Sequence, residues 1–288
     1  MVKETIPKNK KRFIITALYC IIFYILMLYK YANGMLLYQI NPFFFATRED
    51  IFTWIFMQLG IHQRLLNNPS GCLLMDILFY SAPLLYFLHY CYNNRTAYLS
   101  AVWMLIVNWV YVQCYTLYPT NSIEGHTPWL LFPFLFMTRK DATFNVLLDG
   151  LRYFFLFFLG SAGLWKLRRG SIFHLDEMSG ILLEQHIQLL TNSPRYWQSA
   201  FILWLIKHQW VSYLLYLTAT IIELFFLVGF FSKKFDKLLI ILFLLFLVMD
   251  HFIMWIPYYE IMPFLLSLYP NYTKVNMPSF VYQNPLSN

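Results

Sequence analysis

Charged residues are scarce in this sequence. Asp, Glu, Lys and Arg make up only 12% of its 288 residues, whereas a soluble globular domain carries about a quarter. Polar side chains are therefore too few to cover even one soluble domain. Hydrophobic residues reach 59% and aromatic residues 21%, and this excess is typical of helices in lipid with aromatic residues at the membrane interfaces.

The sequence also lacks paired cysteines and concentrated positive charge. Its four cysteines, Cys20, Cys72, Cys91 and Cys114, form no Cys-x-x-Cys pair and no metal-binding spacing. We interpret them as buried apolar residues, and the disulfide state of Cys72 and Cys114 stays open. The net charge of +7 is spread over short clusters between apolar runs, which indicates lipid headgroups as the partner and not nucleic acid.

Six apolar runs approach the length of about 20 residues that a membrane span needs. They are Phe13–Tyr31, Cys72–Tyr92, Ala97–Leu117, Thr143–Trp165, Trp210–Phe231 and Leu238–Ile256. The run Pro128–Met137 is about half that length, so it is either a tilted helix starting near Ser122 or a re-entrant segment. We favour a seventh span, because the short basic turns at 139–140 and 233–237 then both face the side of the N-terminus.

The predicted fold class is an all-α integral membrane protein, a bundle of about seven transmembrane helices with interfacial amphipathic helices. Arg48–Leu66 and part of Gly170–Leu190 have apolar residues at helical spacing but too much charge to span, so we expect them along the outer membrane surface. The basic run Lys8–Arg12 before the first span predicts a cytoplasmic N-terminus in the cell inner or plasma membrane. Residues 271–288 are predicted to form a polar C-terminal tail.

Ionisable residues inside membrane spans are costly and often functional. Those within or bordering the predicted spans are Asp149, Arg152, Lys166, Glu223, Asp250, His251 and, at an interface, His126. With seven spans, Lys166, His126 and His251 fall in the outer half of the bundle, where they could form an acid–base site with Lys166 as base. Alternatively, Lys166 extends to the lipid headgroups and Asp149 neutralises Arg152 on the same helix. In that interpretation His126 is an ordinary loop residue beside Pro128, and His251 bonds to a neighbouring backbone group.

The order of these residues resembles a known family. Gly160-Ser161-Ala162-Gly163-Leu164-Trp165-Lys166-Leu167 ends one span, Gly125-His126 opens the preceding apolar helix, and Met249-Asp250-His251-Phe252 lies in the last span. This pattern resembles the HTTM family, which includes the membrane domain of the vitamin K-dependent γ-glutamyl carboxylases. The resemblance covers roughly residues 10–270, so residues 1–270 are expected to form an HTTM-like transmembrane domain.

The resemblance implies a chemistry. Lys166 would be the base that deprotonates a reduced naphthoquinone cofactor, with His126 and His251 positioning the quinol or an oxyanion in quinol-linked oxidation or carboxylation. The sequence contains no counterpart of the large lumenal portion of the animal carboxylases, which weakens the expectation of protein carboxylation. The alternative is a non-catalytic membrane anchor or assembly subunit for a partner protein. A transporter is less expected, because no internal repeat is visible.

Overall fold

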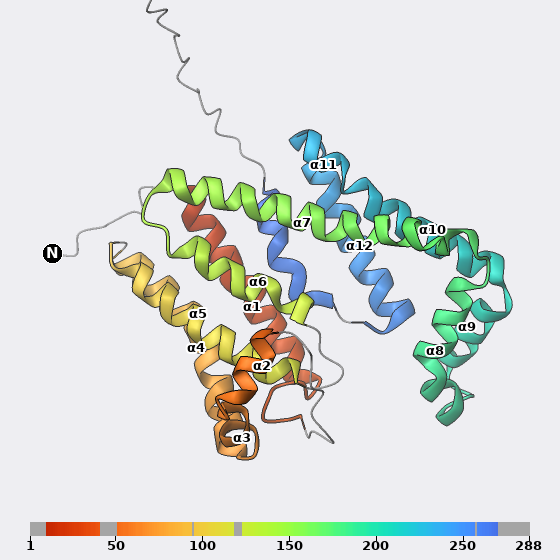
Figure 1. Cartoon of the computed structure of the whole chain (residues 1–288), viewed down its shortest axis with the longest axis horizontal. Helices are drawn as coiled ribbons and strands as arrows, with labels where there is room; N and C mark the ends of the chain where they lie inside the picture. Colours follow the sequence, from red (N-terminus) through yellow and green to blue (C-terminus); the bar gives the residue numbers. More distant parts are fainter. Residues whose placement is uncertain (1–9, 41–50, 94, 118–122, 257, 270–288) are drawn as a thin grey trace, which may run out of the picture.

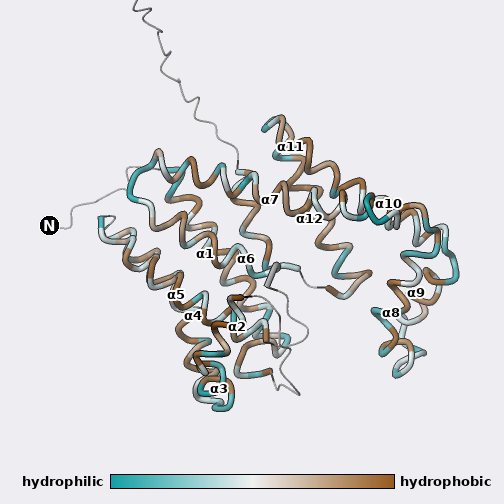
Figure 2. Tube along the Cα trace, viewed as in Figure 1, coloured by the Kyte–Doolittle hydropathy of each residue, from teal (hydrophilic) through white to brown (hydrophobic). Residues whose placement is uncertain are grey.

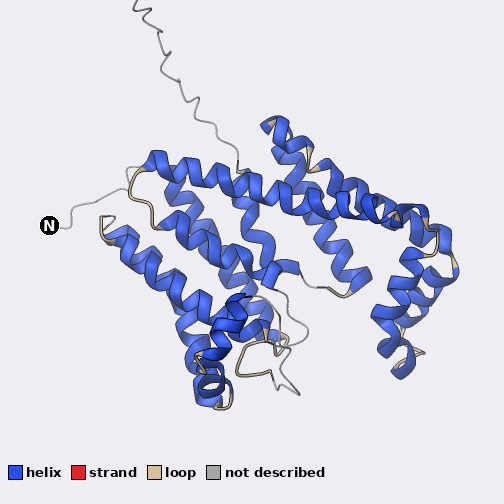
Figure 3. Ribbon diagram, in the orientation of Figure 1, coloured by secondary structure: helices blue, strands red, loops and turns tan. Residues whose placement is uncertain are grey.

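The computed structural model describes residues 10–40, 51–93, 95–117, 123–256 and 258–269, with side chains for most of them. Throughout these ranges the regular secondary structure is helical and includes no strand (Figure 3). The predictions made for Lys8 and Asn9, for residues 48–50 and for the tail at 271–288 lie outside the described residues.

Twelve α-helices and three 3₁₀-helices follow one another along the described ranges. They are α1 (Lys10–Ala32), α2 (Ile51–Gln58), α3 (Ile61–Leu66), α4 (Pro69–Tyr92), α5 (Ala97–Thr116), α6 (Ile123–Phe136), α7 (Asp141–Arg169), η1 (Ser171–Phe173), α8 (Glu177–Asn192), α9 (Trp197–Lys207), α10 (Gln209–Phe225), α11 (Val228–Phe231), η2 (Lys233–Phe235), α12 (Asp236–Met254) and η3 (Tyr258–Leu268).

Six helical segments in the described residues are long and apolar enough to cross a membrane: α1, α4, α5, α7, α10 with α11, and η2 with α12. At most half of each apolar window is buried inside the protein, and in the last two segments less than a third. Figure 2 shows hydrophobic residues along the shafts and hydrophilic ones mostly near the ends. Because apolar side chains face outward, the prediction of an all-helical multi-pass membrane protein is confirmed, with six spanning helices as the supported number.

An N-terminal group of helices consists of α1, α4, α5 and α6. Aromatic side chains fill its interior: Tyr19 of α1 contacts the rings of Phe132 and Phe136 on α6, and Phe79 of α4 stacks on Tyr111 of α5 with centroids 3.8 Å apart. Such ring pairs add specific geometry to the burial of area. They fix α6 beside α1, although the 14 residues of α6 reach only about 21 Å.

A C-terminal group consists of α7 and the helices packed on its second half, α10 and α12. In Figure 1, α7 runs from the N-terminal group across to α10. Gly160 and Gly163 permit this contact: a Cβ on Gly163 would lie 3.1 Å from the backbone nitrogen of Leu224, and one on Gly160 would lie 2.4 Å from the side chain of Leu227. These two glycines therefore allow α7 and α10 to approach each other closely.

The two groups meet around η3. The helix α12 ends at Met254, and Trp255 adopts a left-handed conformation with φ of 56°, which turns the chain back. The segment that follows, η3, is a separate 3₁₀-helix that packs against α1, α6, α7 and α12. Because its core residues Phe264 and Leu268 are fully buried, η3 is held inside the protein.

Helices α8 and α9 form a hairpin at the end of the C-terminal group (Figure 1). A small separate core joins it to α10 and α12 through Met178, Leu182 and Ile202, with Tyr216 and Ile253. Nε2 of His186 lies 2.7 Å from the carbonyl oxygen of Ile253, which ties α8 to the end of α12. The sequence indicated an amphipathic segment in α8, but α9 was not predicted as a helix.

Candidate functional site: two buried lysine–glutamate pairs

The C-terminal group contains an ion pair between α7 and α10. Nζ of Lys166 lies 2.8 Å from Oε1 of Glu223, and the side chains are 25% and 6% exposed. The same ammonium lies 5.2 Å from the ring centroid of Tyr216, whose hydroxyl is 2.7 Å from that of Ser171. Lys166 therefore points into the protein and is held by a partner, which disfavours the interpretation that it merely extends to the lipid headgroups.

Glu223 has an oxygen to spare. Its Oε2 is buried and has no hydrogen-bond partner in the described part of the chain. Leaving such an atom unsatisfied is costly in a low-dielectric interior, so it calls for a partner such as an ordered water, an ion or a ligand. Glu223 is also part of the wall of a pocket of about 540 Å³ between α7, α10, α12 and η3, which we call the Glu223 pocket.

The Glu223 pocket is mostly apolar. Its aromatic walls come from three of the surrounding elements and comprise Phe158, Trp165, Phe243, Phe246 and Tyr258. Its polar side chains are Glu223, Ser161 and the hydroxyl of Tyr258. Small-molecule sites typically have this size and this combination of apolar walls with a few polar groups.

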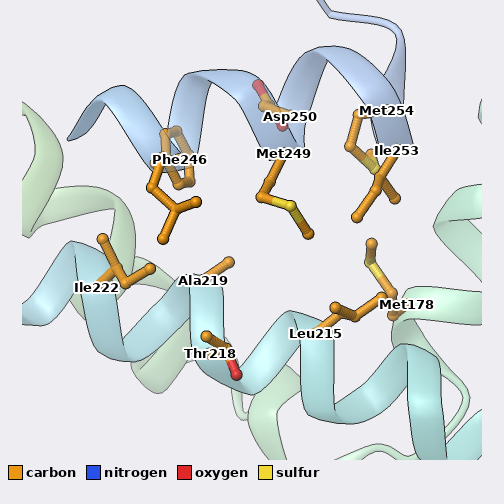
Figure 4. Close-up of a pocket in the computed structure, with 11 residues that line it drawn as sticks. Met178, Leu215, Thr218, Ala219, Ile222, Phe246, Met249, Asp250, Ile253 and Met254 are labelled. Atoms are coloured by element: carbon orange, nitrogen blue, oxygen red, sulfur yellow. The ribbon is translucent and has the colours of Figure 1, made fainter. Parts of the chain in front are cut away.

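A second pocket, of about 190 Å³, lies further along the seam between α10 and α12 (Figure 4). Met249 and Met254 of α12 and Met178 of α8 contribute to its walls, and we call it the methionine pocket. Asp250 borders it from α12, although in Figure 4 its carboxylate lies on the side of α12 away from α10. Phe246 borders both pockets.

The N-terminal group contains a second lysine–glutamate pair. Nζ of Lys30, near the end of α1, lies 3.1 Å from Oε1 of Glu260 in η3, with side chains 7% and 12% exposed. The ammonium also lies 3.4 Å from Nε2 of His126 and 4.1 Å from the ring centroid of Tyr115. Burial alone would raise the pKa of Glu260, but the charges of Lys30 and His126 hold it below its usual value. A void of only about 10 Å³ adjoins the pair.

The three site residues predicted from the sequence therefore lie in three different environments. Lys166 pairs with Glu223 beside the larger pocket, and His126 lies against Lys30. His251 packs on the ring of Tyr259 with centroids 5.4 Å apart, and its Nδ1 is buried without a hydrogen-bond partner among the described residues. Neither histidine borders the Glu223 pocket or the methionine pocket.

Two of the remaining intramembrane charges, Arg152 and Asp149, also have partners. Arg152 is buried and binds both carboxylate oxygens of Asp236, at 3.1 and 2.6 Å, and the carbonyl oxygen of Gly229. Asp149 does not neutralise Arg152 as the alternative interpretation proposed; its carboxylate is 39% exposed and pairs with Lys233 at 2.8 Å. These contacts fasten α7 to the start of α12.

Sequence reasoning missed Lys30 and Glu260. Lys30 stands in the last turn of the first apolar helix, and Glu260 follows Pro257 in a segment too short to span. A lysine and a glutamate that both lie at predicted helix ends normally suggest solvent. The available signal was the apolar run Ile261–Leu266 directly after Glu260, which indicates that this segment returns into the protein.

Three further observations concern the cysteines, metal binding and similarity to known proteins. Cys72 and Cys114 are buried free thiols, as is Cys20, which agrees with the interpretation of these cysteines as apolar residues. Among the described residues, no group of three or more His, Cys, Asp or Glu side chains is placed to hold a metal ion. Comparisons of the chain with protein-family profiles, with curated proteins and with solved structures found no match.

Proposed function

We propose that this chain is a membrane-embedded enzyme that binds a reduced, lipid-soluble quinone in the Glu223 pocket. The observation that carries the proposal is the unpartnered Oε2 of Glu223 in the wall of an apolar pocket, with Lys166 on the other oxygen. The resemblance of the segment around Lys166 to the HTTM family supports the same ligand class.

The residues present fit such a ligand. Flat aromatic walls suit a ring system, and a volume of about 540 Å³ lies within the range of about 300–1,000 Å³ for small-molecule sites. The spare carboxylate oxygen suits a hydroxyl group, which can donate a hydrogen bond to it. A reduced quinone supplies two electrons to an acceptor when its hydroxyl protons are removed.

The chain's own part in this chemistry is to move a proton. We assign the role of first base to Glu223, because it lines the pocket and its Oε2 has no hydrogen-bond partner among the described residues. The ammonium of Lys166 forms an ion pair with Oε1, and it carries a proton that it can release and regain. The proposal therefore keeps Lys166 in the acid–base pair and adds Glu223, which the sequence pattern did not assign to the site.

Substitution of Glu223 tests the proposal. In lipid nanodiscs with 2-methyl-1,4-naphthoquinol, we expect Glu223→Gln to weaken binding about tenfold or more, since a hydrogen bond to a charged group contributes about 1.5–3 kcal/mol. Lys166→Arg should keep binding but lose oxidation of the quinol in air-saturated buffer, because arginine keeps the charge and does not release its proton. The matched controls are Glu184→Gln and Lys207→Arg, both at exposed positions.

Wild-type binding and turnover in both Glu223→Gln and Lys166→Arg would refute the proposal. The non-catalytic alternative, an anchor for a partner protein, predicts neither binding nor turnover of the quinol in the wild type itself. If the wild type binds the quinol but neither control variant does, the substitutions perturb the fold. The unfolding midpoint of each variant is therefore first compared with that of the wild type.

We also propose that α6 crosses the membrane, which makes seven crossings, and that α8 and α9 lie at the membrane interface. Two contacts support the crossing by α6. Arg12 at the start of α1 donates to the carbonyl oxygen of Phe136 at 3.0 Å, and Lys30 near its end lies 3.4 Å from Nε2 of His126. The ends of α6 thus approach points on α1 that are about 27 Å apart along its axis, close to the thickness of the hydrocarbon core.

Exposed aromatic residues support the interfacial position of the α8–α9 hairpin. Trp197 and Trp204 of α9, with Trp210 at the start of α10, are all largely exposed. Arg195 and Lys207 flank α9 at its two ends. Tryptophan beside basic residues is typical of the headgroup level of a bilayer.

A further inference from the structure

The two pockets of the C-terminal group meet at one point on the seam between α10 and α12. Phe246 of α12 is part of the wall of both. On α10, Ile222 borders the methionine pocket and its neighbour Glu223 borders the Glu223 pocket. Figure 4 shows Phe246 and Ile222 together at one end of the methionine pocket. Phe246 and Ile222 therefore stand at the boundary between the two pockets, and a ligand that occupies both must pass these side chains.

The interior of the methionine pocket is hydrocarbon and thioether. In Figure 4, Leu215, Ala219 and Met249 face the space between the helices. The hydroxyl of Thr218 already donates to the carbonyl oxygen of Leu214 at 2.8 Å. Methionine is flexible and polarizable, so it adapts to ligands of irregular shape. This lining suits a hydrocarbon chain better than a polar head.

The methionine pocket is elongated and reaches the outer surface of the bundle. Its α10 wall runs from Leu215 to Ile222, which corresponds to about 10 Å along a helix. Leu245 and Met249, on its α12 wall, are 50% and 40% exposed. A chain can thus lie along the seam and enter it sideways from the bilayer.

We propose that the seam between α10 and α12 binds a single-tailed amphiphile, with its ring head in the Glu223 pocket and its hydrocarbon tail in the methionine pocket. The tail passes Phe246 and Ile222, which makes these two side chains determinants of specificity for tailed over tailless ligands. The identity of the head rests on the proposed function, whereas the tail assignment rests on the methionine pocket itself.

Photolabelling of the full chain in nanodiscs tests the tail position. The probe is the reduced 1,4-naphthoquinol with a decyl chain that ends in a diazirine, and the comparison probe is the same chain without the ring. We expect the ringed probe to label residues around Met249 and Leu215. Ala219→Trp, which fills the methionine pocket, should reduce this labelling about tenfold, the equivalent of ~1.4 kcal/mol.

Matched variants guard against misfolding. Leu214→Trp places the same side chain on the same helix at a position that is 56% exposed and outside the pocket, so it should leave labelling unchanged. Met249→Trp fills the pocket from α12 and should act like Ala219→Trp.

Two results would overturn the proposal. One is labelling of lipid-facing residues on other helices that neither blocking variant reduces. The other is equal labelling of the methionine pocket by the ringless chain, which would assign the pocket to an acyl chain of the bilayer. Failure of the proposed function looks different: tailless 2-methyl-1,4-naphthoquinol would then show no binding that depends on Glu223. If the tailless ring binds through Glu223 and the tail label lies elsewhere, only the tail assignment is wrong.

Discussion

The N-terminal and C-terminal groups each bury a lysine–glutamate pair, and the two pairs differ in what surrounds them. Lys30 and Glu260 are 7% and 12% exposed, beside a void of about 10 Å³. Lys166 and Glu223 are 25% and 6% exposed, and a pocket of about 540 Å³ adjoins them. The same chemical pair can therefore join two elements in one place and prepare a binding site in another. The deciding features are the unpartnered carboxylate oxygen of Glu223 and the pocket that this residue lines.

The largest expected effect comes from removing one partner of the enclosed pair. Lys30→Met leaves the carboxylate of Glu260 buried beside His126 and Tyr115 without its main counter-charge. Breaking a buried pair in this way costs about 3–5 kcal/mol. We expect a clearly lower unfolding midpoint in mild detergent, measured by circular dichroism, than for Lys166→Met, whose site is partly open. Equal losses in the two variants would remove the distinction between the pairs.

The buried pair of Arg152 and Asp236 extends the comparison to a purely structural contact. Arg152→Met should also destabilise by about 3–5 kcal/mol, because it leaves Asp236 uncompensated. The double variant Arg152→Met with Asp236→Leu should recover much of that loss, since hydrophobic replacement of a whole buried pair is often neutral. A double variant as unstable as the single one would show that Arg152 contributes through its bond to Gly229 instead.

A smaller effect, with opposite signs at two positions, is expected from glycines of α7. Gly163→Ala places a Cβ 2.9 Å from Cγ of Leu224, and overpacking of this kind costs about 1–3 kcal/mol. Gly150→Ala on the same helix meets no atom within 4 Å and should stabilise by about 0.5–1 kcal/mol, because alanine favours the helix more than glycine does. Unfolding midpoints that move in the same direction would contradict the close approach of α7 and α10.

The last prediction concerns the side of the membrane on which three loops lie, and it involves no expected change in stability. Cysteines introduced at Arg139 and Lys234, both exposed, should react with a membrane-impermeant maleimide from the same side of sealed vesicles. A cysteine at Asn33, at the other end of α1, should react from the opposite side. If residues 139 and 234 react from the same side as residue 33, α6 does not cross and the seven-crossing topology is wrong.

The sequence allowed the helical membrane fold to be predicted, because apolar runs as long as Phe13–Tyr31 and Leu238–Ile256 are suited to cross a bilayer and not to face water. It also singled out Lys166 as a candidate base, and the small residues Gly160 and Gly163 as part of the same motif. The pairings could not be predicted, because they join residues distant in sequence: Lys30 with Glu260, and Arg152 with Asp236. A charge near a helix end looks the same in sequence whether it faces headgroups or another helix.

The return of η3 into the protein was the main feature that local patterns did not reveal. It depends on the left-handed turn at Trp255, a residue type that rarely adopts that conformation. Tyr258, Tyr259 and Glu260 then come to border the Glu223 pocket, His251 and Lys30, respectively. Local propensity carries no signal for a contact that only tertiary packing creates.

The most direct test of the two roles is a paired measurement on Glu223→Gln and Glu260→Gln. For each variant, binding of 2-methyl-1,4-naphthoquinol and the unfolding midpoint are determined on the same nanodisc preparation. We predict that Glu223→Gln loses binding and keeps the midpoint near that of wild type, whereas Glu260→Gln lowers the midpoint and keeps the binding of its folded fraction. Loss of binding in Glu260→Gln with full binding in Glu223→Gln would contradict the assignment of the site.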